Sequence, residues 1–433
     1  MNPNTDKQVS LAGMAGRSAR PAGHAVRRVP RRKIKIPWWA IVAVVAVIVL
    51  IIVLVGVFSG DKKTGPTLSA RELTGYTLTP DKLCEKVSYY LVGVTGDDPQ
   101  DTMDMLAVLC FDRKADTATL LQIPVATYIG DGEEHTVAKI GNVWGTPKSY
   151  DWCTVCRKAI PAKEIKDGAH TVCGGKTETR PGSSVSELAG IINKQYGLPV
   201  DNYLIIPRAG LAQLIDEVGG LDLKLSDKIT VDDVEYLAGT RVLPGKAAVY
   251  YATTFGYDGT PASDIARMKR QRELLAGLIS RLSRYKVSEL YNDDWRKDDI
   301  LSTVMNGASP IRMDNSELGK ARLLGERNDS STQNDKYNSV LAKFIQRLCK
   351  VELSAFTCHI LPGEPAAKGT MALYSAHRTE TINLLKETMN PYDLTLDDKT
   401  VGLEEISRKK KSDVATATLD TVLVVQSEPA QTE

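Results

Sequence analysis

Apolar and polar positions alternate in blocks through the middle of the chain, and these blocks predict both strands and helices. Four short apolar runs, rich in β-branched and aromatic residues and bounded by Gly, Asp or Pro, are typical of buried strands. They are residues 89–94, 105–111, 117–124 and 203–207. Apolar residues recur at helical spacing over 185–196, 211–218 and 265–282. Strands that alternate with helices predict a layered α/β/α domain with a central mixed sheet over residues 84–290.

The pattern weakens on both sides of this predicted domain. Residues 59–83 are polar, contain Gly and Pro, and predict a stalk. Residues 291–400 predict a C-terminal extension, in which 359–392 has the pattern of a strand-and-helix subdomain. Residues 401–433 are polar and repetitive, so we expect a mobile tail there.

One segment near the N-terminus carries no charged side chain at all. Residues 38–58 are apolar throughout, and Trp38 and Trp39 stand at their edge. At about 1.5 Å per helical residue such a run reaches roughly 30 Å, the thickness of the hydrocarbon core of a bilayer. A cleaved signal peptide is the alternative, but its apolar stretch would be shorter and would end in small residues. The run therefore predicts a single transmembrane helix.

Charge predicts the orientation of this helix. Residues 1–37 contain nine Lys or Arg and one acidic residue, Asp6, a net charge of +8. Cytoplasmic flanks collect Lys and Arg, so we expect a basic cytoplasmic arm, a single pass through the plasma membrane and an extracytoplasmic main domain. Contact with anionic membrane lipid explains the arm better than nucleic acid does. The other 396 residues carry 46 basic and 52 acidic side chains, and a negative domain offers no nucleic-acid footprint.

Seven cysteines bear on the extracytoplasmic part, and three of them share a hydrophilic insertion at about residues 150–180. Cys153-x2-Cys156 is followed after thirteen residues by His170-x2-Cys173. Two short ligand pairs with such a separation suit a tetrahedral zinc ion. Disulfides are the alternative, because thiols oxidise outside the cytoplasm. The odd cysteine count leaves at least one thiol outside an intrachain bridge. Cys349 and Cys358 are nine positions apart, and this spacing favours a local disulfide between them.

The familiar catalytic signatures are missing from the sequence, but two polar groups remain as candidates. Asp101 lies where a loop enters a predicted strand. Asp264, Arg267, Arg270 and Gln271 open the longest predicted helix. The last three of these are three and four residues apart and share one helix face. Arginines near a helix N-terminus suit a phosphate, although arginines on a helix are more often solvated surface.

Several sequence blocks, in order, resemble the LytR-CpsA-Psr family of cell-envelope proteins. The blocks are residues 89–112, 120–129, 137–145, 197–207, 218–223, 237–254 and 263–275. This resemblance implies a phosphotransferase that moves a glycopolymer from a polyprenyl pyrophosphate carrier onto peptidoglycan. It also implies magnesium on acidic residues, arginines on the pyrophosphate and an apolar groove for the lipid tail.

Carried over to this chain, the family pattern makes Asp101 the magnesium ligand. Arg267 and Arg270 would hold the pyrophosphate, with Gln271 and Asp264 in the same motif. The chain also departs from the pattern, since the family's Arg-Asp pair is replaced by Val125 and Ala126, and a family arginine by Thr253. Pro99 and Gln100 stand where the family has another arginine.

These departures leave two interpretations of the function. The first is an active glycopolymer transferase with a rearranged site. The second is a catalytically impaired relative that binds polyprenyl phosphate or wall polymer, or acts as an extracytoplasmic scaffold.

Overall fold

The computed structural model describes most of the chain beyond residue 86. The described residues are 87–97, 102–113, 115–130, 138–145, 149–160, 162–180, 184–200, 202–292, 299–306, 312–313, 341–391, 393–409, 412 and 415–427. The predicted cytoplasmic arm, transmembrane helix and stalk lie outside these residues, and so does Asp101. In the described ranges, no helix is long and apolar enough to cross a membrane.

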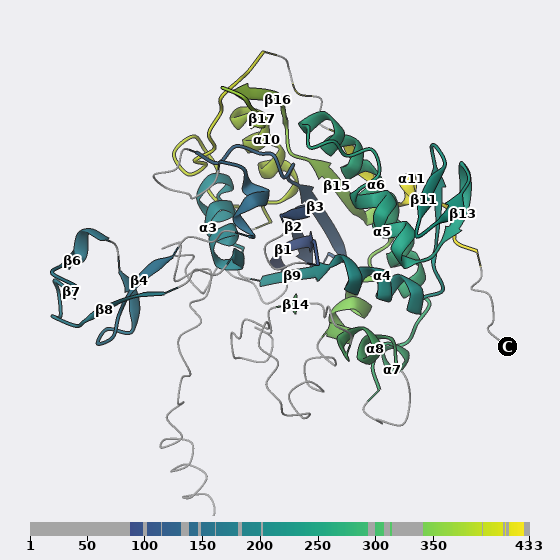
Figure 1. Ribbon diagram of the computed structural model, residues 1–433, viewed down its shortest axis with the longest axis horizontal. Helices are drawn as coiled ribbons and strands as arrows, with labels where there is room; N and C mark the ends of the chain where they lie inside the picture. Colours follow the sequence, from purple (N-terminus) through teal and green to yellow (C-terminus); the bar gives the residue numbers. More distant parts are fainter. Residues whose placement is uncertain are drawn as a thin grey trace, which may run out of the picture. The chain divides into compact units, whose positions relative to one another are not determined.

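A seven-stranded mixed sheet forms the centre of the fold (Figure 1). Its strand order is β14(Arg312–Met313), β9(Asn202–Pro207), β1(Val87–Thr95), β2(Met103–Asp112), β3(Thr117–Gln122), β15(Phe356–Ile360) and β18(Thr416–Thr418). β1 pairs antiparallel with β2 and parallel with β9, and β3 pairs parallel with β15. β1, β2 and β9 contain three of the strands that the apolar runs predict, and β3 matches the fourth, 117–124, but ends two residues earlier at Gln122.

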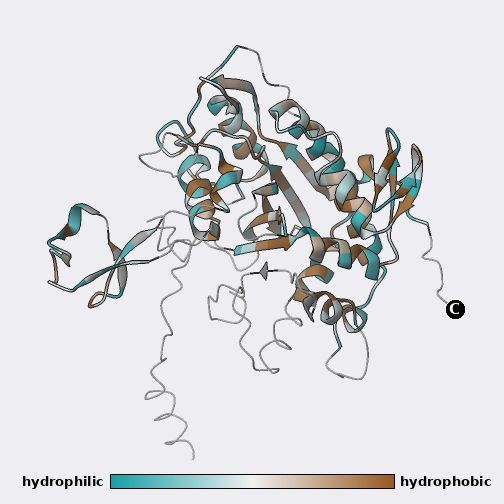
Figure 2. Cartoon of the chain, viewed as in Figure 1, coloured by the Kyte–Doolittle hydropathy of each residue, from teal (hydrophilic) through white to brown (hydrophobic). Residues whose placement is uncertain are grey.

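Helices cover both faces of the sheet and create two separate apolar cores (Figures 1 and 2). Successive strand residues point to opposite faces, so Tyr90 and Val94 of β1 enter one core while Tyr89 and Leu91 enter the other. The first core is closed by α4(Arg208–Glu217), α5(Gly245–Thr253) and α6(Pro261–Leu282). The second is closed by α3(Ser184–Tyr196) and α10(Arg378–Thr388). The predicted layered α/β/α class with a central mixed sheet is thereby confirmed.

Smaller elements complete the described part of the chain. Two antiparallel strand pairs follow α4: β10(Leu221–Leu225) with β13(Gly239–Leu243), and between them in the chain β11(Ile229–Val231) with β12(Val234–Tyr236). Three short helices come after α6: α7(Val287–Leu290), α8(Ile300–Asn306) and η5(Leu353–Ala355). The hairpin β16(Gly363–Lys368)–β17(Met371–Ala376) precedes α10, and α11(Leu419–Val422) follows β18.

The hydrophilic insertion lies between β3 and α3, after η2(Ile140–Val143). It holds a three-stranded sheet of β5(Lys158–Ile160), β4(Tyr150–Cys153) and β8(Thr177–Arg180). A short 3-10 turn, η3(Ala162–Glu164), leads into the hairpin of β6(Ile165–Lys166) and β7(Ala169–His170).

The C-terminal part of the chain differs from the expected extension and mobile tail. β15 lies inside the central sheet beside β3, because its apolar residues Phe356 and Cys358 fill the first core. β18 then pairs with β15, and Leu419 directly after it is fully buried. The described residues of the expected tail are therefore packed on the domain. The polar composition of residues 401–433 did not indicate this packing, because an edge strand is held mainly by backbone hydrogen bonds and less by apolar side chains.

Candidate functional site

Thr260 caps the N-terminus of α6. The Thr260 hydroxyl accepts a hydrogen bond from the Ser263 backbone N–H, and Pro261 occupies the first helical turn. The Asp258 carboxylate accepts hydrogen bonds from the hydroxyls of Ser263 and Thr260. These bonds lower the pKa of Asp258 to about 2. The cap fixes where the helix starts, and so fixes the positions of Asp264 and Arg267 one turn later.

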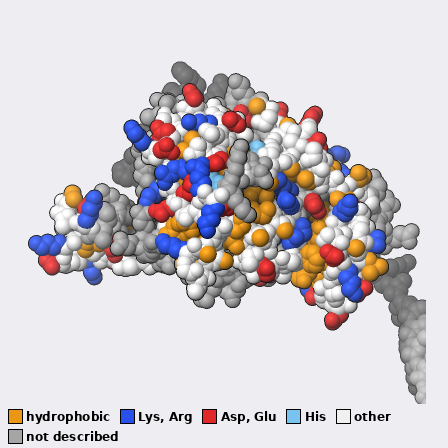
Figure 3. Space-filling model, turned by 90° about the horizontal axis from the view of Figure 1, so that it is seen from above, with side chains coloured by type: hydrophobic (Ala, Val, Ile, Leu, Met, Phe, Trp, Pro, Cys, Tyr) orange, Lys and Arg blue, Asp and Glu red, His pale blue; other side chains and the backbone are white. Residues whose placement is uncertain are grey.

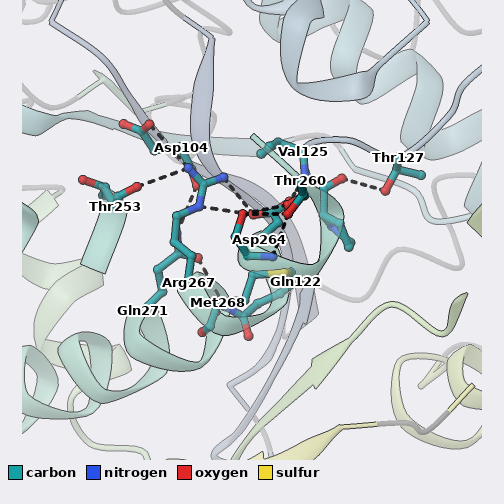
Figure 4. Close-up of polar contacts among 12 residues, drawn as sticks. Asp104, Gln122, Val125, Thr127, Thr253, Thr260, Asp264, Arg267, Met268 and Gln271 are labelled. Carbon is teal, nitrogen blue, oxygen red and sulfur yellow. Dashed lines mark hydrogen bonds and ion pairs between the residues drawn. The ribbon is translucent and has the colours of Figure 1, made fainter. Parts of the chain in front are cut away.

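Asp264 and Arg267 form an ion pair in the interior of the protein (Figure 4). Arg267 Nη2 lies 2.8 Å from Asp264 Oδ1, and both side chains are 1% exposed. Asp264 Oδ2 also accepts a hydrogen bond of 2.9 Å from the Val125 backbone N–H. Burial raises the pKa of Asp264, and the adjacent Arg267 opposes this shift. Arg267 Nη1 donates to the Thr253 carbonyl, and its guanidinium lies 3.8 Å from the ring centre of Tyr257.

A second ion pair, between Arg208 and Asp104, lies beside the first. Arg208 donates two hydrogen bonds of 2.5 and 2.6 Å to the Asp104 carboxylate, and Arg267 Nη1 lies 3.8 Å from the same carboxylate. Thr95, at the end of β1, pairs with Met103 on one side and Pro207 on the other. The residues that follow these partners, Asp104 and Arg208, therefore meet at this end of the sheet.

Gln271 holds α6 against the start of β2. Its side-chain amide donates a 3.0 Å hydrogen bond to the Asp104 carbonyl, and Gln271 is 4% exposed. Gln122, at the end of β3, donates to the Met268 carbonyl and accepts a hydrogen bond from Arg272 Nε. Gln271 thus positions the strand that follows Asp101 rather than presenting its amide to solvent.

Arg270 lies on the neighbouring helix face and is half-buried. It donates to the Tyr251 and Phe255 carbonyls at the C-terminal end of α5. Its guanidinium also lies 5.5 Å from the Tyr251 ring centre and 5.6 Å from that of Phe255. In the described residues Arg270 forms no ion pair with a carboxylate at contact distance, but its charge interacts with that of Glu273 on the same helix.

The structure thus brings together four of the five residues that the sequence proposes for this site, while Asp101 lies outside the described residues. Asp104 and Arg208 were missed. A signal existed for Asp104, since it is a charged residue directly before the apolar run 105–111, and buried charges are almost always paired. Nothing in the sequence pointed to Arg208 as its partner, because the two are 104 positions apart.

The two carboxylates described at this site, Asp104 and Asp264, are both already paired with arginines. Asp104 is held by Arg208, and Asp264 by Arg267. Magnesium needs oxygen ligands that are free to complete an octahedron. Val125 and Ala126 offer no side-chain oxygen either. Asp101, the magnesium ligand that the family pattern implies, lies outside the described residues.

Comparison with known proteins identifies the domain that carries this site. The model of the LytR_cpsA_psr family matches residues 173–294, which include α3 to α7 and the segment from Asp264 to Gln271. Residues 173–294 of this chain are thus similar to the LytR_cpsA_psr family. The family resemblance drawn from the sequence blocks is confirmed.

Named relatives of the family match over longer stretches. The cell wall biosynthesis protein LcpA of Corynebacterium glutamicum is 26% identical over 217 residues, 49% of this chain and 38% of LcpA. The polyisoprenyl-teichoic acid–peptidoglycan teichoic acid transferase TagV of Bacillus subtilis is 25% identical over 182 residues, 40% of this chain and 45% of TagV. The matched part thus spans less than half the length of either relative. A crystal structure of B. subtilis TagV aligns over 72% of this chain and all of TagV's chain, with 16% identity and a TM-score of 0.46.

A second polar cluster lies in the insertion and has the composition of a metal centre. The side-chain ligand atoms of Cys153, Cys156, His170 and Cys173 all lie within 4.8 Å of one another. All three cysteines are free thiols. The four residues that the spacing singled out therefore do come together, and they can hold a metal ion.

The expected disulfide between Cys349 and Cys358 does not form. Both residues are free thiols. Cys358 is fully buried within β15, where it packs in the first core, and burial raises the pKa of its thiol to about 12. Nine residues of separation suggested a local bridge, but the strand directs this side chain into the core.

Proposed function

We propose that this protein is a cell-envelope glycopolymer transferase that moves a polymer from a polyprenyl pyrophosphate carrier to peptidoglycan. The observation that carries the proposal is the family match over 173–294, which encloses the assembled group of Asp264, Arg267, Arg270 and Gln271. The named relatives support it, since one is a cell wall biosynthesis protein and others are polyisoprenyl-teichoic acid–peptidoglycan teichoic acid transferases.

The reaction is a displacement at phosphorus. A hydroxyl of peptidoglycan attacks the phosphorus that carries the glycopolymer, and a new P–O bond forms. The P–O bond to the bridging oxygen of the pyrophosphate breaks, polyprenyl phosphate leaves, and the hydroxyl proton passes to a base or to water. Such chemistry needs positioning and neutralisation of charge more than a covalent nucleophile.

The charge balance of the site favours a phosphate ligand. Three guanidinium groups, those of Arg208, Arg267 and Arg270, stand near two carboxylates, Asp104 and Asp264. Arg270 is the arginine of the three without a carboxylate at contact distance. Burial raises the pKa of the nearby Glu273 to about 7, so this group carries only part of a negative charge at neutral pH and net positive charge remains. Figure 3 shows apolar side chains gathered on one face of the molecule next to Lys and Arg side chains.

Magnesium binding is part of the proposal only through Asp101. When bound, the ion would neutralise pyrophosphate oxygens. The paired state of Asp104 and Asp264 makes the arginines the main source of positive charge in the described part of the site.

A reconstituted transfer assay tests the proposed activity. Full-length protein in detergent would be given a short polyprenyl-pyrophosphate-linked glycan and peptidoglycan oligomers, and the transferred glycan and released polyprenyl phosphate would be measured. We expect Arg270→Ala to reduce turnover at least tenfold, because each charged contact to phosphate contributes about 1.5–3 kcal/mol. Lys269→Ala is the matched control, since Lys269 is exposed on the same helix. If the unmodified protein transfers no glycan under any metal condition, the proposed enzymatic activity is rejected.

One observation favours the alternative of a binding protein without catalysis. Arg267 is 1% exposed and its charge is already neutralised by Asp264, with Asp104 close by. A protein of that kind would bind the polyprenyl pyrophosphate glycan but release no polyprenyl phosphate. Binding without release in the same assay would establish this second function.

We also propose that the protein is anchored in the plasma membrane by residues 38–58, with the α/β domain outside the cytoplasm. The support is the charge-free run and its basic flank, as argued above. Protease added to intact cells stripped of their wall should digest the α/β domain and spare the basic arm. Protection of the α/β domain would disprove this topology.

A further inference from the structure

The insertion contains two turns of the same sequence and the same geometry. Cys153-Thr-Val-Cys156 is repeated as His170-Thr-Val-Cys173. In the first turn the Arg157 N–H donates to the Cys153 carbonyl at 2.8 Å, and in the second the Gly174 N–H donates to the His170 carbonyl, also at 2.8 Å. Arg157 and Gly174 both have left-handed backbones, with φ of 54° and 67°.

Each turn also directs backbone N–H groups at its sulfur atoms. The Cys156 N–H donates to Cys153 Sγ, and the Gly175 N–H donates to Cys173 Sγ, both at 3.4 Å. N–H donors stabilise sulfur that carries negative charge. Two equivalent turns that each offer two ligands and donors to sulfur are what a tetrahedral metal needs from a protein.

The distances between the ligand atoms are longer than a sulfur–sulfur bond and within a few tenths of an ångström of those around a metal. Cys156 Sγ lies 3.0 Å from Cys173 Sγ, and Cys153 Sγ lies 3.4 Å from it. His170 Nδ1 lies 3.2 Å from Cys173 Sγ and 3.4 Å from Cys156 Sγ. A disulfide has an S–S distance of about 2.05 Å. Ligands on one tetrahedral zinc ion, with Zn–S of about 2.3 Å, stand roughly 3.5–3.8 Å apart.

The histidine is oriented by a carboxylate on its far side. Glu164 Oε2 lies 3.2 Å from His170 Nε2, and the His170 side chain is fully buried. With Nε2 bonded to Glu164, Nδ1 faces the three sulfurs. Histidines that bind metal commonly donate their second N–H to a carboxylate, which fixes the tautomer and the ring plane.

We propose that Cys153, Cys156, His170 and Cys173 bind one structural zinc ion, that Glu164 positions His170, and that the insertion folds only with the metal. Four protein ligands leave no open position for a substrate, so the ion is structural rather than catalytic. The insertion has few apolar residues that could form a core in place of the metal. Among its described residues, the large buried apolar side chains are those of Trp152 and Ile160. A unit of this size needs a metal or disulfides to stay folded.

The first test measures metal content. Full-length protein purified in detergent without chelator should contain about one zinc per chain by elemental mass spectrometry. Cys156→Ser should lose the zinc and Cys156→His should retain it, because imidazole can replace the exposed thiolate. Cys349→Ser, which removes a thiol outside the cluster, and Val172→Ser, at a side chain that is 76% exposed, are the controls. Protein without zinc, or a peptide map with Cys153 or Cys156 bridged to Cys173, would overturn the proposal.

A second test separates the metal's role from general stability. Removal of zinc with a chelator should abolish hydrogen-exchange protection in β4 to β8 and leave β1 to β3 protected. Glu164→Gln should weaken zinc affinity about 10–100-fold, the usual effect of losing a carboxylate behind a histidine ligand. Unchanged protection of the insertion after complete zinc removal would refute the coupling of metal to folding.

Discussion

Arg267 and Asp264 form a buried ion pair that connects three separate segments of the fold. Asp264 accepts a hydrogen bond from Val125, just after β3, and Arg267 donates to the Thr253 carbonyl at the end of α5. Both residues sit in the first turns of α6. The residues proposed to bind the ligand are therefore also part of the packing of the domain.

Replacement of Arg267 should destabilise the fold. An arginine that only binds an anion would be expected to matter little for stability, but Arg267→Ala leaves the Asp264 carboxylate buried without its partner. Removing one partner of a buried pair typically costs about 3–5 kcal/mol. Urea denaturation followed by tryptophan fluorescence should show this loss, and Lys269→Ala should show none. An unchanged midpoint for Arg267→Ala would contradict the buried pair.

Replacement of Asp104 should change ligand binding and stability in opposite directions. Its carboxylate neutralises Arg208 and lies 3.8 Å from Arg267. Asp104→Asn removes a negative charge, so we expect tighter binding of a polyprenyl pyrophosphate glycan, by severalfold, together with lower stability. Isothermal titration at two ionic strengths would measure the affinity, and the gain should shrink at high salt. Weaker binding would mean that the arginines do not face the ligand.

Much of the fold could be predicted from the sequence because burial imposes a periodic pattern. The strand runs 89–94 and 105–111 and the helix 265–282 were predictable, since each has its own apolar period. β18 was not, because its residues are polar and its place is set by hydrogen bonds to β15. Local patterns do not contain such long-range pairings.

The candidate site divides in the same way. Asp264 and Arg267 are three residues apart, so their shared helix face follows from helical geometry. The Asp104–Arg208 pair depends on which strands are neighbours, and the sequence does not state that order. The metal ligands were predictable because both of their turns are local.

Restoring the family's Arg-Asp pair at Val125 and Ala126 should harm this chain. From the sequence alone, Val125→Arg with Ala126→Asp would be expected to raise metal affinity or turnover. In the structure the two residues are 8% and 2% exposed and belong to the second core. Gly141 packs closely on Val125, since a Cβ added to Gly141 would lie 2.6 Å from the Val125 Cβ. We expect a loss of several kcal/mol in a denaturation experiment. A double variant as stable as the parent, with stronger metal binding, would reverse this conclusion.

Glu273 should make the stability of the domain depend on pH. It lies on α6 near Arg270, and its Oε2 is buried without a hydrogen-bond partner among the described residues. Burial raises the pKa of Glu273 from 4.5 to about 7, although Arg270 opposes the shift. Between these two values the folded protein keeps a proton that the unfolded chain has lost, so stability falls as pH rises through this window and stays low above it. Glu273→Gln removes the cost of burying the charge.

The free energy of unfolding of Glu273→Gln should therefore match that of the parent near pH 4 and exceed it at pH 8. The gain should be about 1–3 kcal/mol, since partial exposure of the side chain screens the effect. Urea titrations at five or six pH values would measure the difference. Glu404→Gln is the matched control, because Glu404 is exposed. A gain for Glu273→Gln that is equally large at pH 4 and pH 8 would show that the carboxyl group is not titrating in this window.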